Sequence, residues 1–209
     1  VADSGSDFGL PESVHGWVME NFEHIRPGLD DAAQRAQLEH LADWCRRTFK
    51  QLRTVLQVRR ETGFVRECQG DLHLGNLMLI DGRITPFDCI EFNAQLRWID
   101  VISEAAFLVM DIQDRGYQEF GWRFFNGYLQ HTGDYAGVRL LRFYLVYRAL
   151  VRSKVAMLRC GQSTAADEKQ AARAEYQTYI DLAKSYVDAR APVLLITHGV
   201  SGSGKSWYA

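Results

Sequence analysis

The chain contains few cysteines, and they are not arranged for metal binding or cross-linking. Its 209 residues include Cys45, Cys68, Cys89 and Cys160, and no two of these stand in a Cys-x-x-Cys pair. Scattered cysteines argue against a zinc site and a disulfide framework, and they are typical of a protein in a reducing compartment. We expect Cys68 and Cys89, which flank the polar motif described below, to serve in apolar packing.

A large net charge and long apolar runs are also absent. The formal net charge is −2, which gives no electrostatic reason to bind nucleic acid or an acidic membrane. The longest apolar stretch, residues 143–151, is interrupted by Arg148, and no charged-then-apolar leader is present. We therefore expect a cytoplasmic protein with no nucleic-acid or membrane partner. A hydrophobic content of 47% is sufficient for a sizeable core in one domain or a little more.

A polar cluster in the middle of the chain has the spacing of a phosphotransfer site. Residues 69–76 read QGDLHLGN, which places Asp71 and Asn76 five positions apart. Kinases use an Asp and an Asn at this spacing, the Asp to accept the proton of the attacking hydroxyl and the Asn to ligate magnesium. Asp88 follows in the sequence PFD and stands where a second hard oxygen ligand for magnesium is expected.

The sequence between these residues predicts how they meet. Residues 77–80 (LMLI), the pair Asp81-Gly82 and residues 83–85 (RIT) form the pattern of strand, two-residue turn and strand. Such a hairpin returns the chain to its starting point and so brings Asn76 and Asp88 together. An Asp and Asn at this spacing also occur by chance, because both are ordinary turn residues. The hairpin and the third acid together favour the functional interpretation.

These motifs carry a family resemblance. The strings GDLHLGN and PFDCIEF, with the hairpin between them, resemble the C-terminal lobe of the aminoglycoside phosphotransferase and choline kinase-like family, which shares the protein-kinase fold. The usual form of the first motif is HGDLHxxN, and this chain has Gln69 in place of the His. The resemblance implies that Asp71 is the catalytic base, that Asn76 and Asp88 bind Mg²⁺, and that ATP is the phosphate donor.

Other polar and aromatic residues have weaker assignments. We expect His73 to brace the loop through hydrogen bonds, whereas Asp100 is either a brace from the next helix or a plain helix N-terminal acid. A set of acids is expected to form a solvated face, as charge runs usually do. Its members are Asp111, Asp114, Glu119 and Asp134. A series of aromatic residues is expected in the core rather than around a ligand. Its members are Tyr117, Phe120, Trp122, Phe124, Phe125 and Tyr128.

A second motif lies near the C-terminus. The apolar residues 192–197 (PVLLIT) run into residues 199–206 (GVSGSGKS), which match the GxxxxGK[ST] phosphate-binding pattern in full. Such a loop wraps phosphates with backbone N–H groups, while its lysine reaches the β and γ oxygens and its serine ligates magnesium. The candidate nucleotide-binding residues are Gly199, Gly202, Gly204, Lys205 and Ser206. The sequence stops at Ala209, so we expect this loop to bind no nucleotide without the helix and strands that would support it.

The order of the motifs predicts a two-part organisation. Residues 1–191 are expected to form a kinase-like C-lobe of mostly helical α+β class, and residues 192–209 the truncated start of a P-loop domain. The chain thus resembles bacterial proteins that fuse an aminoglycoside phosphotransferase-like domain to a P-loop ATP-binding kinase-like domain. Nothing before Asp71 supplies the Gly-rich loop or strand lysine of a kinase N-lobe. We therefore expect a fragment that lacks an N-lobe upstream and most of a P-loop domain downstream.

Two functions follow as hypotheses. The first is an ATP- and Mg²⁺-dependent phosphotransferase that transfers the γ-phosphate to the hydroxyl of a small molecule, with this fragment inactive alone. The alternative is a kinase-like module that binds nucleotide or a partner without transferring phosphate, while the downstream P-loop domain performs the chemistry. Gln69 is the local hint for the alternative, and the joint presence of Asp71, Asn76 and Asp88 argues against it. No residue specifies an aminoglycoside as the acceptor.

Overall fold

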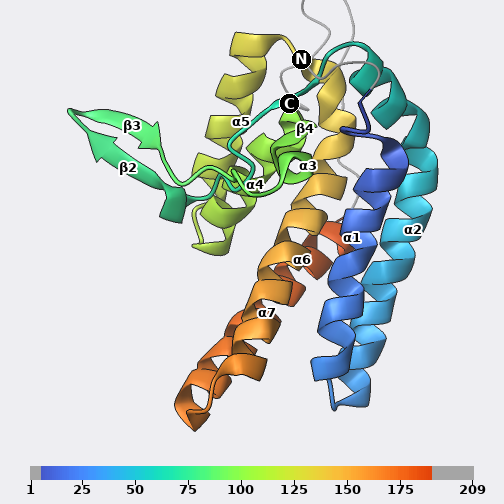
Figure 1. Ribbon diagram of the computed structural model, residues 1–209, viewed down its shortest axis with the longest axis vertical. Helices are drawn as coiled ribbons and strands as arrows, with labels where there is room; N and C mark the ends of the chain where they lie inside the picture. Colours follow the sequence, from blue (N-terminus) through green and yellow to red (C-terminus); the bar gives the residue numbers. More distant parts are fainter. Residues whose placement is uncertain (1–5, 190–209) are drawn as a thin grey trace, which may run out of the picture.

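Helices make up most of the protein, and two small antiparallel strand pairs lie among them (Figure 1). The computed structural model describes residues 6–189. The mostly helical α+β class expected from the sequence is confirmed at this level. The P-loop residues 199–206 and the expected domain boundary at 191 lie outside the described residues.

The first two helices form an antiparallel pair. Helix α1, Pro11–Ile25, begins with a proline, which costs no hydrogen bond there because the first N–H groups of a helix have no partner within it. Helix α2, Ala32–Glu61, is capped by Asp31, which accepts a hydrogen bond from the Gln34 amide at 3.1 Å. Apolar residues three and four apart give α2 one buried stripe, as its sequence predicts. The buried apolar members are Leu38, Leu41, Ala42, Cys45, Phe49 and Leu56.

Two strand pairs frame the polar motif. Strand β1, Val65–Glu67, pairs antiparallel with β4, Trp98–Asp100, and a short helix α3, Ala94–Arg97, leads into β4. The apolar spacing of the sequence predicts a helix over about 98–114, but residues 98–100 pair with β1 and form a strand. Strands β2, Leu77–Ile80, and β3, Arg83–Pro86, form the expected hairpin.

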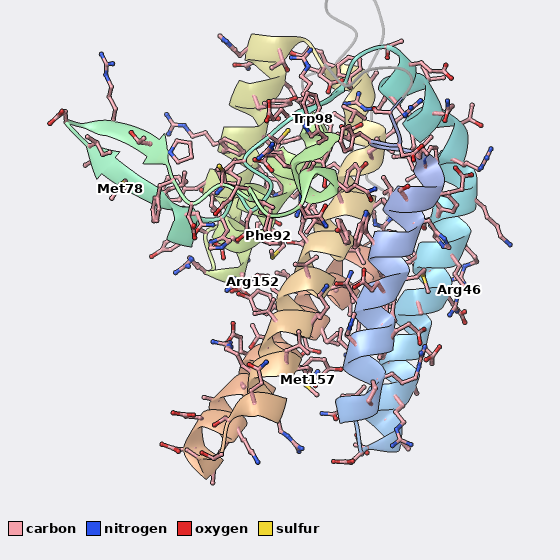
Figure 2. The ribbon with its side chains drawn as sticks, in the orientation of Figure 1. Arg46, Met78, Phe92, Trp98, Arg152 and Met157 are labelled. Carbon is pink, nitrogen blue, oxygen red and sulfur yellow. The ribbon has the colours of Figure 1, made fainter. Side chains whose placement is uncertain are left out.

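The hairpin turn has the backbone that its sequence requires. Asp81 and Gly82 both have positive φ, 49° and 76°, as a two-residue hairpin turn demands. The hairpin projects away from the helices, with Met78 on its surface (Figures 1 and 2). Leu79 and Ile84 are 71% and 74% exposed, so the hairpin contributes little to the core.

The remaining helices build the core around α4. Helix α4, Val101–Asp114, is followed by α5, Gln118–Thr132, and by the long pair α6, Val138–Gln162, and α7, Ala166–Asp188. Short 3₁₀ turns connect α1 to α2 at Arg26–Gly28 and α5 to α6 at Tyr135–Gly137, and a third, Leu74–Asn76, leads into β2. Helix α4 is buried along most of its length and packs against α5 and α6. None of the helices within residues 6–189 has the length and apolar character needed to cross a membrane.

Helix α5 corrects the expectation for the aromatic series. Phe125 is buried, but Tyr117, Phe120 and Trp122 are 57%, 59% and 44% exposed. Tyr117 and Phe120 lie against each other, with ring centroids 6.0 Å apart, instead of packing into the core. The reason is that α5 packs against α4 along one face, so aromatic residues elsewhere around the helix remain at the surface.

Candidate functional site

The predicted base and the predicted metal ligands meet at the base of the hairpin. The Asn76 side-chain amide donates to the backbone oxygen of Asp71 at 3.0 Å and to its carboxylate Oδ2 at 3.2 Å. The backbone N–H of Phe87 donates to the Asn76 carbonyl at 3.0 Å, which closes the hairpin and places Asp88 one residue beyond that contact. The hairpin therefore returns the backbone at Asp88 to the neighbourhood of Asn76, whose side chain contacts Asp71.

His73 orients the Asp71 carboxylate. Its Nδ1 accepts a hydrogen bond from the Gly75 amide at 3.0 Å, so in the neutral ring the proton is on Nε2. That Nε2 lies 3.3 Å from Asp71 Oδ2, the same oxygen that Asn76 contacts. Oδ1 of Asp71 has no hydrogen-bond partner within residues 6–189 and is left to accept a proton from a bound molecule.

The surroundings of Asp71 favour its ionised form. Burial by itself raises the pKa of this carboxyl, but the His73 hydrogen bond and the charges of His73, Arg148 and Arg152 outweigh burial. The net result is a pKa below the ordinary value for an aspartate. Asp71 is therefore ionised near neutral pH, as a general base must be before it can accept a proton.

Gln69, which replaces the usual His of the motif, is the most connected side chain of the loop. Its Oε1 accepts from the Asp71 amide at 2.7 Å, and its Nε2 donates to the carbonyls of Phe87 and Asp88 at 2.9 and 3.1 Å. The Gln69 carbonyl accepts from the Ile90 amide at 3.0 Å. The substitution thus retains a strong connection between the loop that holds the base and the segment that holds Asp88.

Two acids on α4 anchor the backbone of the loop. Glu104 accepts from the amides of Gln69 and Gly70 at 2.9 and 3.1 Å, and Asp111 accepts from the Leu74 amide at 2.9 Å. Both acids were missed as site residues, and Asp111 was expected on a solvated face although it is 1% exposed. The sequence does contain a sign of this role. Glu104 and Asp111 are two helical turns apart, on one face of a helix that is otherwise largely apolar.

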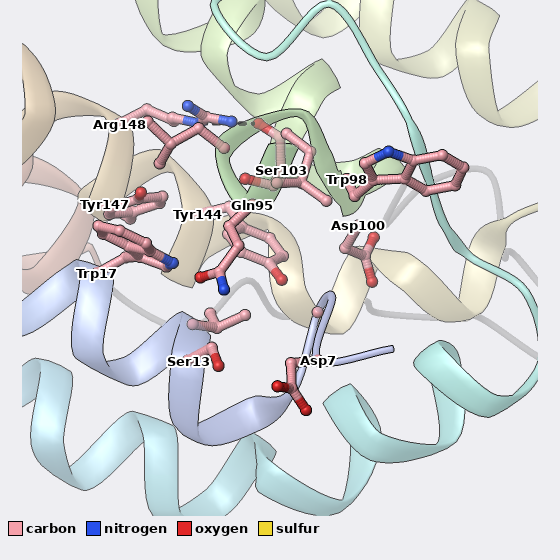
Figure 3. A pocket seen from close by; sticks show the side chains of 14 residues that line it. Asp7, Ser13, Trp17, Gln95, Trp98, Asp100, Ser103, Tyr144, Tyr147 and Arg148 are labelled. Atoms are coloured by element: carbon pink, nitrogen blue, oxygen red, sulfur yellow. Dashed lines mark hydrogen bonds between the residues drawn. The ribbon is translucent and has the colours of Figure 1, made fainter. Parts of the chain in front are cut away.

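Arg148 on α6 also contacts the backbone of the loop. Its guanidinium donates to the Gly70 and Ser103 carbonyls at 3.2 Å each and lies 4.7 Å from the centroid of the Phe107 ring. Figure 3 shows Arg148 at the wall of a cavity, beside Tyr147 of the same helix. The other aromatic side chains around this cavity are Trp17, Trp98 and Tyr144. Arg148 therefore links the helical core to the loop that carries Asp71.

Glycine is required at position 70. Gly70 has φ +91°, in the left-handed region that residues with a side chain rarely adopt. A Cβ at this position would lie 2.9 Å from the backbone oxygen of Leu96. The Gly-Asp sequence of the motif thus reflects the tight packing of the loop against residues 95–98, in addition to its chemistry.

Asp100 has a different role from the brace proposed for it. Its carboxylate accepts from the Ile102 amide at 2.8 Å, which caps α4, and from Nε of Arg59 at 2.7 Å. The amides of the loop bind Glu104 and Asp111 instead. Asp134, also expected on a solvated face, is 4% exposed and contacts the same Arg59 at 2.7 Å. Asp100 thus lies at the N-terminus of α4 and caps it, while Glu104, one turn further along α4, accepts from the loop amides.

The donor set of the site suits magnesium. Asn76 and Asp88 supply an amide oxygen and a carboxylate, and Asn76 keeps its oxygen available because its nitrogen makes the contacts to Asp71. Within residues 6–189 no three His, Cys, Asp or Glu side chains are grouped to hold a metal ion. Magnesium requires no such cage, because it is usually held by one or two protein ligands together with substrate phosphates and water. The residues present therefore fit a magnesium ion that arrives with a nucleotide.

The fold and the site together define a mostly helical domain with an Asp, Asn and Asp cluster at the base of a hairpin. Over 194 residues the chain is 34% identical to uncharacterized proteins of Mycobacterium bovis and of two strains of Mycobacterium tuberculosis. The alignment covers 91% of this chain but 37% of the length of each relative. No family model matches the chain, and no solved structure matches it.

Proposed function

We propose that this chain contains the catalytic loop of an ATP-dependent phosphotransferase that acts on the hydroxyl group of a small molecule. One observation carries the proposal: Asn76 and His73 both contact Oδ2 of Asp71, which leaves Oδ1 to accept a proton. A carboxylate fixed in this way can orient and deprotonate an attacking hydroxyl. A carboxylate with a purely structural role would not need one oxygen that is held by two neighbours and another that is left without a partner.

The remaining residues of the cluster fit the same chemistry. Asn76 and Asp88 would hold magnesium, which when bound neutralises charge on the transferred phosphoryl group. Glu104 accepts from the Gly70 amide and Arg148 donates to the Gly70 carbonyl, so the residue before Asp71 is held at both of its peptide groups and the Asp71 carboxylate is positioned before the acceptor binds. Preorganisation of this kind is how kinases accelerate a step in which the protein forms no covalent bond.

The test is magnesium-dependent ATP turnover against a panel of hydroxyl-bearing metabolites. It should be made in the longest natural form of the protein that contains residues 1–209. Asp71→Asn should lower kcat by about 100-fold or more, because it removes a general base. Asp81→Asn, a change in the exposed hairpin turn, is the matched control and should leave turnover unaltered.

A third variant separates the two candidate nucleotide sites. Loss of turnover with Asp71→Asn but not with Lys205→Ala would assign the chemistry to the loop described above. Loss with Lys205→Ala alone would contradict the proposal, since the P-loop would then perform the chemistry and the kinase-like lobe would only bind.

A further inference from the structure

The Gln69 side chain connects the two halves of the proposed site through both ends of its amide. Oε1 accepts a hydrogen bond from the backbone N–H of Asp71, the base, at 2.7 Å. Nε2 donates to the carbonyls of Phe87 and Asp88, at 2.9 and 3.1 Å. The Gln69 side chain therefore links Asp71, the proposed base, to the two peptide groups that flank Asp88, the second proposed metal ligand.

The segment that receives these bonds has an uncommon backbone conformation. Asp88 has φ +56°, in the left-handed region that is unfavourable for residues with a Cβ. Besides Asp81 in the hairpin turn, it is the other non-glycine residue with positive φ within residues 6–189. Such a conformation persists where surrounding contacts hold it, and it occurs frequently at functional sites. Here the two hydrogen bonds from Gln69 Nε2 hold the backbone on both sides of the Asp88 Cα, because one ends on the Phe87 carbonyl and the other on the Asp88 carbonyl.

We propose that Gln69 is a positioning residue that holds Asp88 in this left-handed conformation and fixes its carboxylate relative to Asp71. This inference rests on the proposed function, since it assigns Asp88 to metal binding. Gln69 acts through Asp88 and Asp71 and does not itself contact the reacting atoms. The role requires a side chain that accepts one hydrogen bond and donates two at the same time. A primary amide does this, because its oxygen accepts and its NH₂ group carries two donor hydrogens.

Side-chain length is as important as chemistry in this role. Asparagine carries the same amide one methylene nearer the backbone, so it cannot reach Asp71 and the Asp88 segment together. Leucine has a similar volume to glutamine and forms no hydrogen bonds. Gln69→Asn and Gln69→Leu therefore test reach and hydrogen bonding separately.

The readout is Mn²⁺ affinity, measured by electron paramagnetic resonance with Mn²⁺ and ADP as the probe. All proteins should carry Lys205→Ala, which removes the P-loop lysine as a second contributor. Gln69→Leu and Gln69→Asn should each weaken Mn²⁺ binding by about 10-fold or more, the usual effect of losing a group that orients a metal ligand. Gln118→Leu, at the exposed start of α5, is the matched control and should bind as the parent does.

The outcomes separate this inference from the proposed function. Wild-type Mn²⁺ affinity in folded Gln69→Leu or Gln69→Asn protein would overturn the role of Gln69 while leaving phosphate transfer by the loop intact. Unchanged affinity in Asp88→Asn, or no Mn²⁺ binding by the parent, would overturn both. Circular dichroism melting shows which variants are folded. If Gln69→Leu does not fold, the more conservative Gln69→Asn decides the result.

Discussion

Arg59 and Asp100 form a bidentate ion pair in the interior of the protein. Nε and Nη2 of Arg59 lie 2.7 and 2.9 Å from the two carboxylate oxygens of Asp100, and both side chains are 4% exposed. The same guanidinium binds Asp134 at 2.7 Å. The pair joins the end of α2 to the start of α4, directly beside strand β1, which leads to the loop that carries Asp71. Burial alone would lower the pKa of Arg59, but hydrogen bonds to Asp134 and Asp100 raise it above its ordinary value.

Removing the Arg59 guanidinium should be strongly destabilising. Arg59→Leu leaves two buried carboxylates without a counter-charge, and breaking a buried pair in this way typically costs about 3–5 kcal/mol. Urea denaturation should therefore show a large loss in the free energy of unfolding. Arg53→Ala on the same helix is the control, because its pair with Glu12 is exposed and should contribute little. Equal stabilities of the two variants would contradict this account.

Gly70→Ala and Gly16→Ala should change the stability of the folded protein in opposite directions. Gly70→Ala places a Cβ 2.9 Å from the Leu96 carbonyl at a residue with φ +91°, so we expect a loss of at least about 1–2 kcal/mol. Gly16 lies within α1, and a Cβ added there would meet no atom within 4 Å, so Gly16→Ala should stabilise by about 0.5–1 kcal/mol. Thermal melting of both variants checks the prediction, and destabilisation by Gly16→Ala would oppose it.

Glu104 should stabilise the loop through its acceptor oxygens. Glu104→Ala leaves the N–H groups of Gln69 and Gly70 without their partner, and each unsatisfied buried group costs about 1–3 kcal/mol. Glu104→Gln keeps one acceptor oxygen and should lose less stability. Hydrogen exchange at the Gln69 and Gly70 amides provides the local measurement. Exchange in Glu104→Ala as slow as in the parent would show that the carboxylate does not hold the loop.

Asp71 should have a pKa below the ordinary value for an aspartate. Because its pKa is lowered in the folded protein, the stability that its charge contributes is present above the unfolded pKa and is lost as pH falls through the folded value. Asp71 should therefore remain ionised throughout the range above about pH 5. The chemical shift of its carboxyl carbon, followed from pH 2 to 8, gives the midpoint directly. A midpoint above the ordinary value for an aspartate would contradict the contacts described for Asp71.

Local sequence patterns predicted the helices and the hairpin well because their causes are local. Pro11 and the sequence Arg26-Pro27-Gly28 predict a helix that begins near residue 11 and ends near residue 25, and α1 spans Pro11–Ile25. The Asp81-Gly82 turn has the positive φ angles that its sequence predicts. The assignment failed at residues 98–100, where pairing with β1 overrides any local preference. It also failed for Phe120 and Trp122 of α5, which are exposed although Phe125 is buried, since periodicity does not reveal which neighbour covers a helix.

The return of the chain from Asn76 to the segment that carries Asp88 was determined by the sequence alone, because a two-residue turn between matched strands brings their ends together. The tertiary structure decided which groups hold these residues in place. Glu104, Asp111 and Arg148 lie 33 or more positions from Asp71 along the chain, and their contacts exist because α4 and α6 pack beneath the loop. Hydrogen bonds between distant segments depend on the packing of whole helices, which no local pattern of residue types encodes.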